Sequence, residues 1–60
     1  MNDNEVLWSI YHSHVDEWRR IWAARKLLVA YDLCTSKESQ DLPLTVLFDI
    51  VADLEAGVVQ

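Results

Sequence analysis

Residues 11–18, YHSHVDEW, hold the side chains best suited to chemistry: two histidines, two carboxylates and a serine between aromatic residues. His, Asp and Glu ligate metal ions, and Ser with His and Asp can form a nucleophilic site. On a helix, however, His12 and His14 lie about 200° apart at about 100° per residue, so they cannot chelate one ion. The helical zinc pair needs histidines at i and i+4. This stretch lacks that spacing.

The stretch therefore predicts the polar side of a helix rather than a reactive site. His12 with Asp16, or His14 with Glu17, offers at most two metal ligands, and a symmetric dimer would be needed to supply four. Ser13 shares a face with His12, but an exposed helix surface provides no oxyanion hole and does not exclude water. We expect no catalytic residue, no metal site and no cofactor. His12 and Asp16 would form an ordinary i, i+4 surface pair.

Length and composition limit the architecture to one small domain spanning residues 1–60. Chains of this size bury only about 60% of their unfolded surface, and many gain stability from disulfides, metals or oligomerisation. Cys34 is the single cysteine, which excludes a disulfide within the chain. A content of 52% hydrophobic residues with three Trp argues against disorder.

No apolar run approaches the roughly 20 residues of a membrane span, and the acidic N-terminus does not resemble a signal peptide. We expect a soluble, cytoplasmic protein.

The apolar pattern predicts an all-α fold with two helices of unequal length. Residues 3–34 contain no Gly or Pro, and Asn2 with Glu5 forms a capping-box pattern at their start. Apolar residues recur at helical spacing from Leu7 to Trp22. The following segment is apolar almost all round, which predicts burial by more than one neighbour. The predicted helices cover residues 3–34 and 43–56, joined by a loop over residues 35–42.

The second helix has clear boundaries in the sequence. Pro43 is placed to lie in its first turn, with Asp41 or Leu42 at the cap, and Gly57 is placed to end it. A single short loop between two helices predicts an antiparallel helical hairpin.

The unequal lengths of the two helices predict self-association. At 1.5 Å per residue the first helix would be about 48 Å long and the second about 20 Å, so the second cannot cover the start of the first. The uncovered stripe would then pack against a second copy, because exposed apolar patches of this size mark interfaces and two-fold dimers are common. We expect a homodimer resembling a four-helix bundle. Its predicted interface comprises Leu7, Ile10, Tyr11, Val15, Trp18 and Trp22.

Charge is distributed unevenly along the chain, whose net charge is −5. Four of the five bases lie in the segment WRRIWAARK, where they alternate with Trp as in proteins that bind single-stranded nucleic acid. Trp18 and Trp22 lie on the apolar stripe, however, and the net charge opposes phosphate binding, so nucleic acid is the alternative partner. No membrane binding is expected. The candidate nucleic-acid contacts are Arg19, Arg20, Arg25 and Lys26.

The leading functional interpretation is a non-enzymatic homodimer that binds another protein. It would act as a regulator, adaptor or inhibitor of the kind that compact phage or bacterial genomes encode, and a structural subunit of a larger complex is a further alternative. Acidic residues on the outer side of the second helix would form a patch that suits a basic partner protein. The predicted acidic face comprises Asp49, Asp53 and Glu55.

Overall fold

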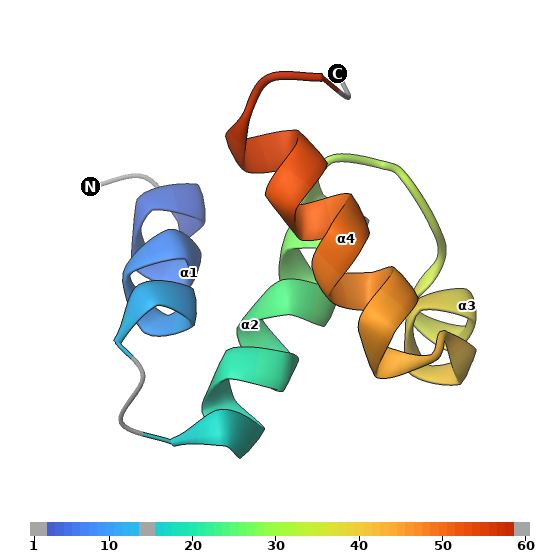
Figure 1. Cartoon of the computed structure of the whole chain (residues 1–60), viewed down its shortest axis with the longest axis horizontal. Helices are drawn as coiled ribbons and strands as arrows, with labels where there is room; N and C mark the ends of the chain where they lie inside the picture. The colour runs from blue at the N-terminus through green and yellow to red at the C-terminus, as the bar shows by residue number, and fades with distance from the viewer. Residues whose placement is uncertain (1–2, 14–15, 59–60) are drawn as a thin grey trace.

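The structure is a computed structural model that describes residues 3–13 and 16–58. Its regular elements are four helices: α1 (Asp3–His12), α2 (Glu17–Ala30), α3 (Ser36–Asp41) and α4 (Leu44–Glu55) (Figure 1). The described residues contain no strand. The predicted all-α class is therefore confirmed.

The predicted single helix over residues 3–34 is wrong, because the chain leaves the helical conformation between α1 and α2. The backbone N–H and the hydroxyl of Ser13 both donate to the Ile10 carbonyl, at 3.2 and 2.8 Å. Asp16 is extended and caps α2, its carboxylate accepting from the Trp18 N–H at 2.9 Å. Ser and Asp compete for backbone hydrogen bonds in this way, so they can end a helix without Gly or Pro. The cap predicted at Asn2 lies outside the described residues.

α2 ends at Ala30 in a turn that needs one residue in the left-handed conformation. Asp32 takes this position with φ 61°, and its N–H donates to the Val29 carbonyl at 3.0 Å. The Leu33 N–H donates to the Leu28 carbonyl at 3.0 Å, which completes a Schellman motif. Glycine is the usual residue here, so the sequence carries no obvious signal for this helix end.

α3 occupies the segment that was predicted to be a loop. Thr35 caps it, because its Oγ1 accepts from the Glu38 N–H at 3.3 Å while Glu38 Oε2 accepts from the Thr35 N–H at 3.1 Å. Ser39 is buried, and its hydroxyl donates to the Ser36 carbonyl at 2.8 Å. The capping box is thus the local reason for a helix of only six residues.

Thr35→Ala should therefore destabilise the protein by about 1 kcal/mol, the usual effect of removing an N-cap side chain. The measurement is urea denaturation followed by circular dichroism at 222 nm. Thr35→Ser keeps the hydroxyl and serves as the matched control. Equal midpoints for Thr35→Ala and the unmodified chain would contradict the role of this cap.

The second predicted helix, residues 43–56, is confirmed as α4 to within one residue at each end. Pro43 is the N-cap rather than a first-turn residue, and Asp41 belongs to α3, so the predicted cap is corrected. Gly57 has φ 77° and ends α4 as predicted. Its N–H donates to the Leu54 carbonyl at 3.1 Å, and the Val58 N–H donates to the Asp53 carbonyl at 2.9 Å.

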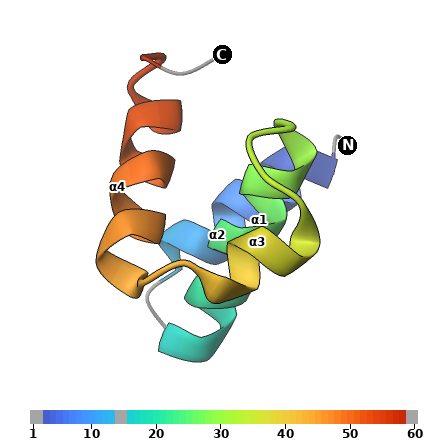
Figure 2. The ribbon, with the colours of Figure 1, turned by 90° about the vertical axis from the view of Figure 1, so that its right-hand side faces the viewer.

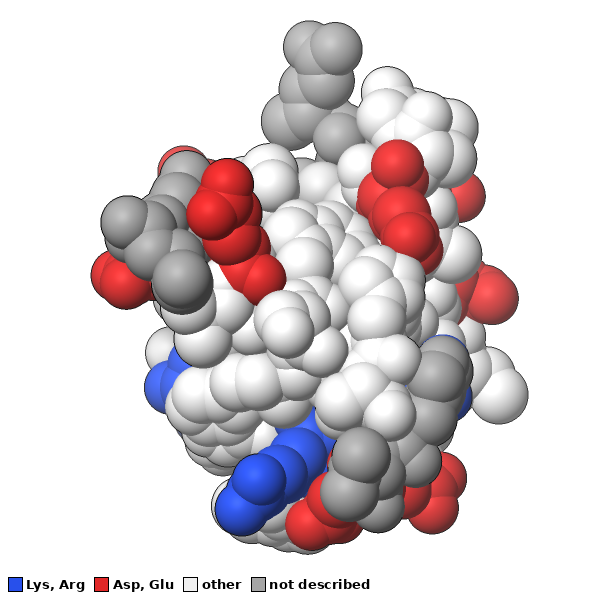
Figure 3. All heavy atoms as spheres, turned by 90° about the vertical axis from the view of Figure 1, so that its left-hand side faces the viewer, with Lys and Arg blue, Asp and Glu red and all other residues white. Residues whose placement is uncertain are grey.

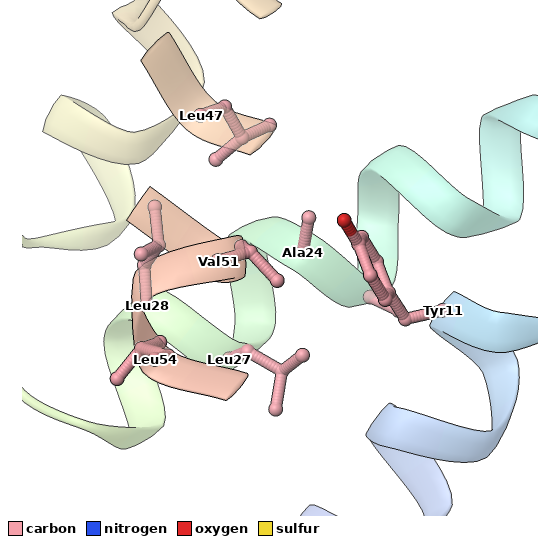
Figure 4. Packing of buried hydrophobic residues seen from close by; sticks show 8 residues of the cluster. Tyr11, Ala24, Leu27, Leu28, Leu47, Val51 and Leu54 are labelled. Carbon is pink, nitrogen blue, oxygen red and sulfur yellow. The ribbon is translucent and has the colours of Figure 1, made fainter. Parts of the chain in front are cut away.

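α2 is the central element, in contact with α1, α3 and α4 (Figure 2). α2 has several neighbours, as predicted for its apolar second half, but that half is not buried on all sides, because Trp22 and Val29 are exposed. The predicted two-helix hairpin is replaced by a four-helix arrangement. Figure 4 shows apolar side chains of α2 and α4 meeting, with Tyr11 entering from α1. The buried core comprises Tyr11, Ala23, Ala24, Leu27, Leu28, Leu47, Val51 and Leu54.

Candidate functional site

The described part of the YHSHVDEW stretch serves to join helices. His12 Nε2 lies 3.0 Å from Glu55 Oε1 on α4, and its ring stacks on Trp8 with a centroid distance of 5.7 Å and an interplanar angle of 17°. Because Asp16 caps α2, the predicted His12–Asp16 pair is wrong. His14 lies outside the described residues. Within residues 3–13 and 16–58, no three His, Cys, Asp or Glu side chains gather as a metal site.

Cys34 follows α2 and is half-buried. Burial raises the pKa of its thiol, and the neighbouring Glu38 carboxylate raises it further. A thiol with a raised pKa stays protonated at neutral pH and is a poor nucleophile. This environment favours the predicted packing role over a catalytic one.

Arg20 is held between aromatic rings of two other helices. Its guanidinium carbon lies 4.9 Å from the ring centroid of Tyr11 on α1 and 4.9 Å from that of Phe48 on α4. Such cation–π contacts use the charge to hold the helices together. Arg20 is thus separated from the other cations of the predicted nucleic-acid segment.

The predicted dimer stripe divides into a buried part and an exposed part. Tyr11 is buried, and Leu7 and Ile10 pack against the core, so α1 does not carry the uncovered stripe that motivated the dimer. Trp18 and Trp22 were expected in the interior or in the interface, yet their exposed fractions within the chain are 71% and 39%. Val15 lies outside the described residues.

α2 buries Ala23, Ala24, Leu27 and Leu28 on one side and exposes its tryptophans on the other. Residues at i, i+4, i+7 and i+11 share one side of a helix, which places Trp18 and Trp22 in line with Arg25 and Val29. Lys26 lies beside them, its Nζ 5.9 Å from the Trp22 ring centroid. We call these five residues the Trp face.

A groove of about 650 Å³ separates the Trp face from α3 and the start of α4. Two further hollows, of about 430 and 470 Å³, lie toward α1, and all three border Trp22. The α2–α3 groove is lined by Trp18, Ile21, Trp22, Arg25, Lys26 and Val29 of α2, Ser36, Ser39 and Gln40 of α3, and Leu42, Pro43 and Leu44.

The cations of α2 have no carboxylate partner among the described residues. The one basic side chain within 4.0 Å of a carboxylate there is His12, next to Glu55, so Arg19 and Arg20 do not form the pairs that their spacing from Asp16 and Glu17 allows. Arg25 is half-buried, and its Nε is buried without a hydrogen-bond acceptor in the same part of the chain. The predicted basic segment thus provides the unpaired charges Arg19, Arg25 and Lys26 on or beside the Trp face.

The predicted acidic face on α4 is also divided. Asp49 and Asp53 are exposed at i, i+4 spacing, whereas Glu55 is exposed but bound to His12. On the side of the molecule shown in Figure 3, acidic side chains gather at both upper edges and at the base, and Lys and Arg lie in the lower half.

No family model matches the chain, and neither curated proteins nor solved structures show a significant match. Among the described residues, no helix combines the length and apolarity needed to cross a bilayer.

Proposed function

We propose that this protein is a small non-enzymatic binding protein that acts by docking on another protein, as a regulator, adaptor or inhibitor. The observation that carries the proposal is the exposure of Trp18 on the Trp face, 71% of its surface. A large aromatic side chain gains free energy when it leaves water. Tryptophan and arginine are also the residue types that dominate binding energy at protein interfaces.

A second function, single-stranded nucleic-acid binding, is favoured by one specific observation. The Trp face places two exposed tryptophans beside Arg25 and Lys26, the combination that stacks bases and neutralises phosphates. The net charge of −5 opposes this function at long range. The Arg20 guanidinium also makes cation–π contacts with Tyr11 and Phe48, so it is not free to bind a phosphate. These two facts make a protein the preferred partner.

Self-association remains a proposal, with the Trp face as its surface in place of α1. A two-fold dimer through this face would bring Arg19, Arg25 and Lys26 of both copies together, and like charges in an interface are unfavourable. We therefore favour a different protein as the occupant. The acidic residues Asp49 and Asp53 provide a second patch, of negative charge, that suits a basic partner.

Photo-crosslinking distinguishes these three partners in one experiment. With p-benzoylphenylalanine in place of Trp18, irradiation in the native host should give a product that is protease-sensitive, nuclease-resistant and larger than two chains. The same probe in place of the exposed Lys37 on α3 is the control and should give little of this product.

A nuclease-sensitive product would support nucleic-acid binding. A product of twice the 7.0 kDa chain mass would support a homodimer. Equal products from both positions would contradict the proposal.

A further inference from the structure

The α2–α3 groove combines apolar walls with positive charge. Trp18, Trp22 and Val29 are exposed apolar residues of its α2 wall, and Leu44 is one on the opposite side. The charged residues among its lining are Arg25 and Lys26, both cations. In a chain whose net charge is −5, this groove is therefore a local positive site. Its chemistry suits a ligand with one apolar side and acidic flanks.

The positive charge of the groove is available to a ligand. No carboxylate of the described residues lies within 4.0 Å of the charged groups of Arg25 or Lys26. Arg25 and Lys26 line the groove without a carboxylate partner in the described part of the chain, so an acidic group of a ligand can pair with them there. Guanidinium groups bind carboxylates through paired, charge-assisted hydrogen bonds. An acidic side chain of a partner fits this requirement.

The walls of the groove favour a helical ligand over an extended one. The long wall is α2, whose central backbone groups are bonded within the helix, and the described residues offer no strand edge. An extended peptide would leave its own backbone groups without partners, whereas a helix bonds them internally. The side of α2 from Trp18 to Val29 extends about 16 Å, which matches about three turns of a docked helix.

Resting on the protein-binding function proposed above, we infer that the α2–α3 groove receives an acidic amphipathic helix of a partner protein. Apolar side chains of that helix pack on Trp18 and Trp22, and its carboxylates pair with Arg25 and Lys26. A second copy of this chain fits less well, because a two-fold dimer through the groove would bring the cations Arg25 and Lys26 of both copies together.

The test uses two helical peptides that differ only in charge. Each has about 18 residues, or five turns, with leucine at i, i+3, i+4 and i+7 spacing, and each is held helical by the same side-chain staple. One carries glutamate at the remaining positions and the other lysine. Binding to the full chain is measured by fluorescence anisotropy of the labelled peptides at low and at moderate salt. Labelled single-stranded DNA is measured in parallel.

We expect the acidic peptide to bind at least about tenfold more tightly than the basic one, and more weakly as salt rises. Arg25→Gln with Lys26→Gln should weaken its binding about tenfold or more. Trp18→Ala, at an exposed position that leaves folding intact, should weaken it as well. Lys37→Gln removes an exposed cation of α3 that does not line the groove, and is the control that should keep full affinity.

Three results would overturn the inference. The first is equal or tighter binding of the basic peptide, the second is no binding of the acidic peptide, and the third is tighter binding of the single-stranded DNA. Failure here, together with a protein crosslink from the Trp18 position, would reject the acidic-helix partner and retain the proposed protein-binding function. Sedimentation equilibrium of the chain alone checks for a second copy, which would appear as a concentration-dependent dimer lost in Trp18→Ala.

Discussion

Leu27→Ala is expected to reduce the free energy of unfolding by about 2–5 kcal/mol, which would leave much of the protein unfolded. Leu27 is fully buried on α2, in the core between α2 and α4 (Figure 4). At about 0.05–0.15 kcal/mol per residue, a chain of 60 residues has a total stability of only about 3–9 kcal/mol. Alanine is the best helix former, so the loss would come from packing and not from helix propensity. Urea denaturation followed by circular dichroism measures it.

Val29→Ala is the matched control for this variant. Val29 lies on the same helix but is exposed on the Trp face, so its truncation leaves no cavity. We expect a change within about 1 kcal/mol, since alanine also restores helix propensity relative to valine. Similar losses for Leu27→Ala and Val29→Ala would mean that α2 packs with a different side inward.

Arg20→Ala should destabilise the protein by about 1–3 kcal/mol, a large effect for a surface-type residue. The substitution removes two cation–π contacts, each worth about 0.5–2 kcal/mol depending on how far the charge is removed from water. It also removes the aliphatic stem that packs beside Tyr11 and Phe48. Because these rings belong to α1 and α4, the loss should loosen both helices on α2. The measurement is again urea denaturation.

Two further variants separate the cation–π contribution to this loss from the packing contribution. Arg20→Met keeps an unbranched stem without the charge, so it should recover the packing part of the loss and not the cation–π part. Arg19→Ala removes the neighbouring arginine, which is exposed, and should change the free energy of unfolding by less than about 0.5 kcal/mol. If Arg19→Ala and Arg20→Ala are equally stable, the position of Arg20 between the two rings is wrong.

The sequence predicted best the elements that carry conventional boundary residues. α4 was predicted nearly residue for residue because Pro43 and Gly57 bound it. The break between α1 and α2 was missed because Ser13 and Asp16 are weaker signals than Gly or Pro. α3 was missed although its capping-box pattern, Thr35 followed by Glu38, is readable in the sequence.

The candidate surface was predicted only in part, for a reason that lies in α2. This helix has two apolar sides, one with Ala23 and Leu27 and the other with Trp18 and Trp22. Trp18 and Trp22 continue the apolar stripe of the preceding residues at helical spacing, so the sequence pattern predicted the Trp side to face inward. In the structure the side with Ala23 and Leu27 is buried instead. This outcome depends on the break between α1 and α2, because it lets α1 pack against α2.

The central position of α2 also has a kinetic consequence. α2 contacts both of its neighbours along the chain, α1 and α3, so much of the packing forms between segments close in sequence. Proteins with such low contact order fold in microseconds to milliseconds. The contacts between α1 and α4, such as Tyr11 with Phe48 and His12 with Glu55, join the two ends of the chain and require the largest loop to close. Amide protons of α2 should therefore exchange with solvent last, because α2 keeps its other neighbours when any one of them detaches.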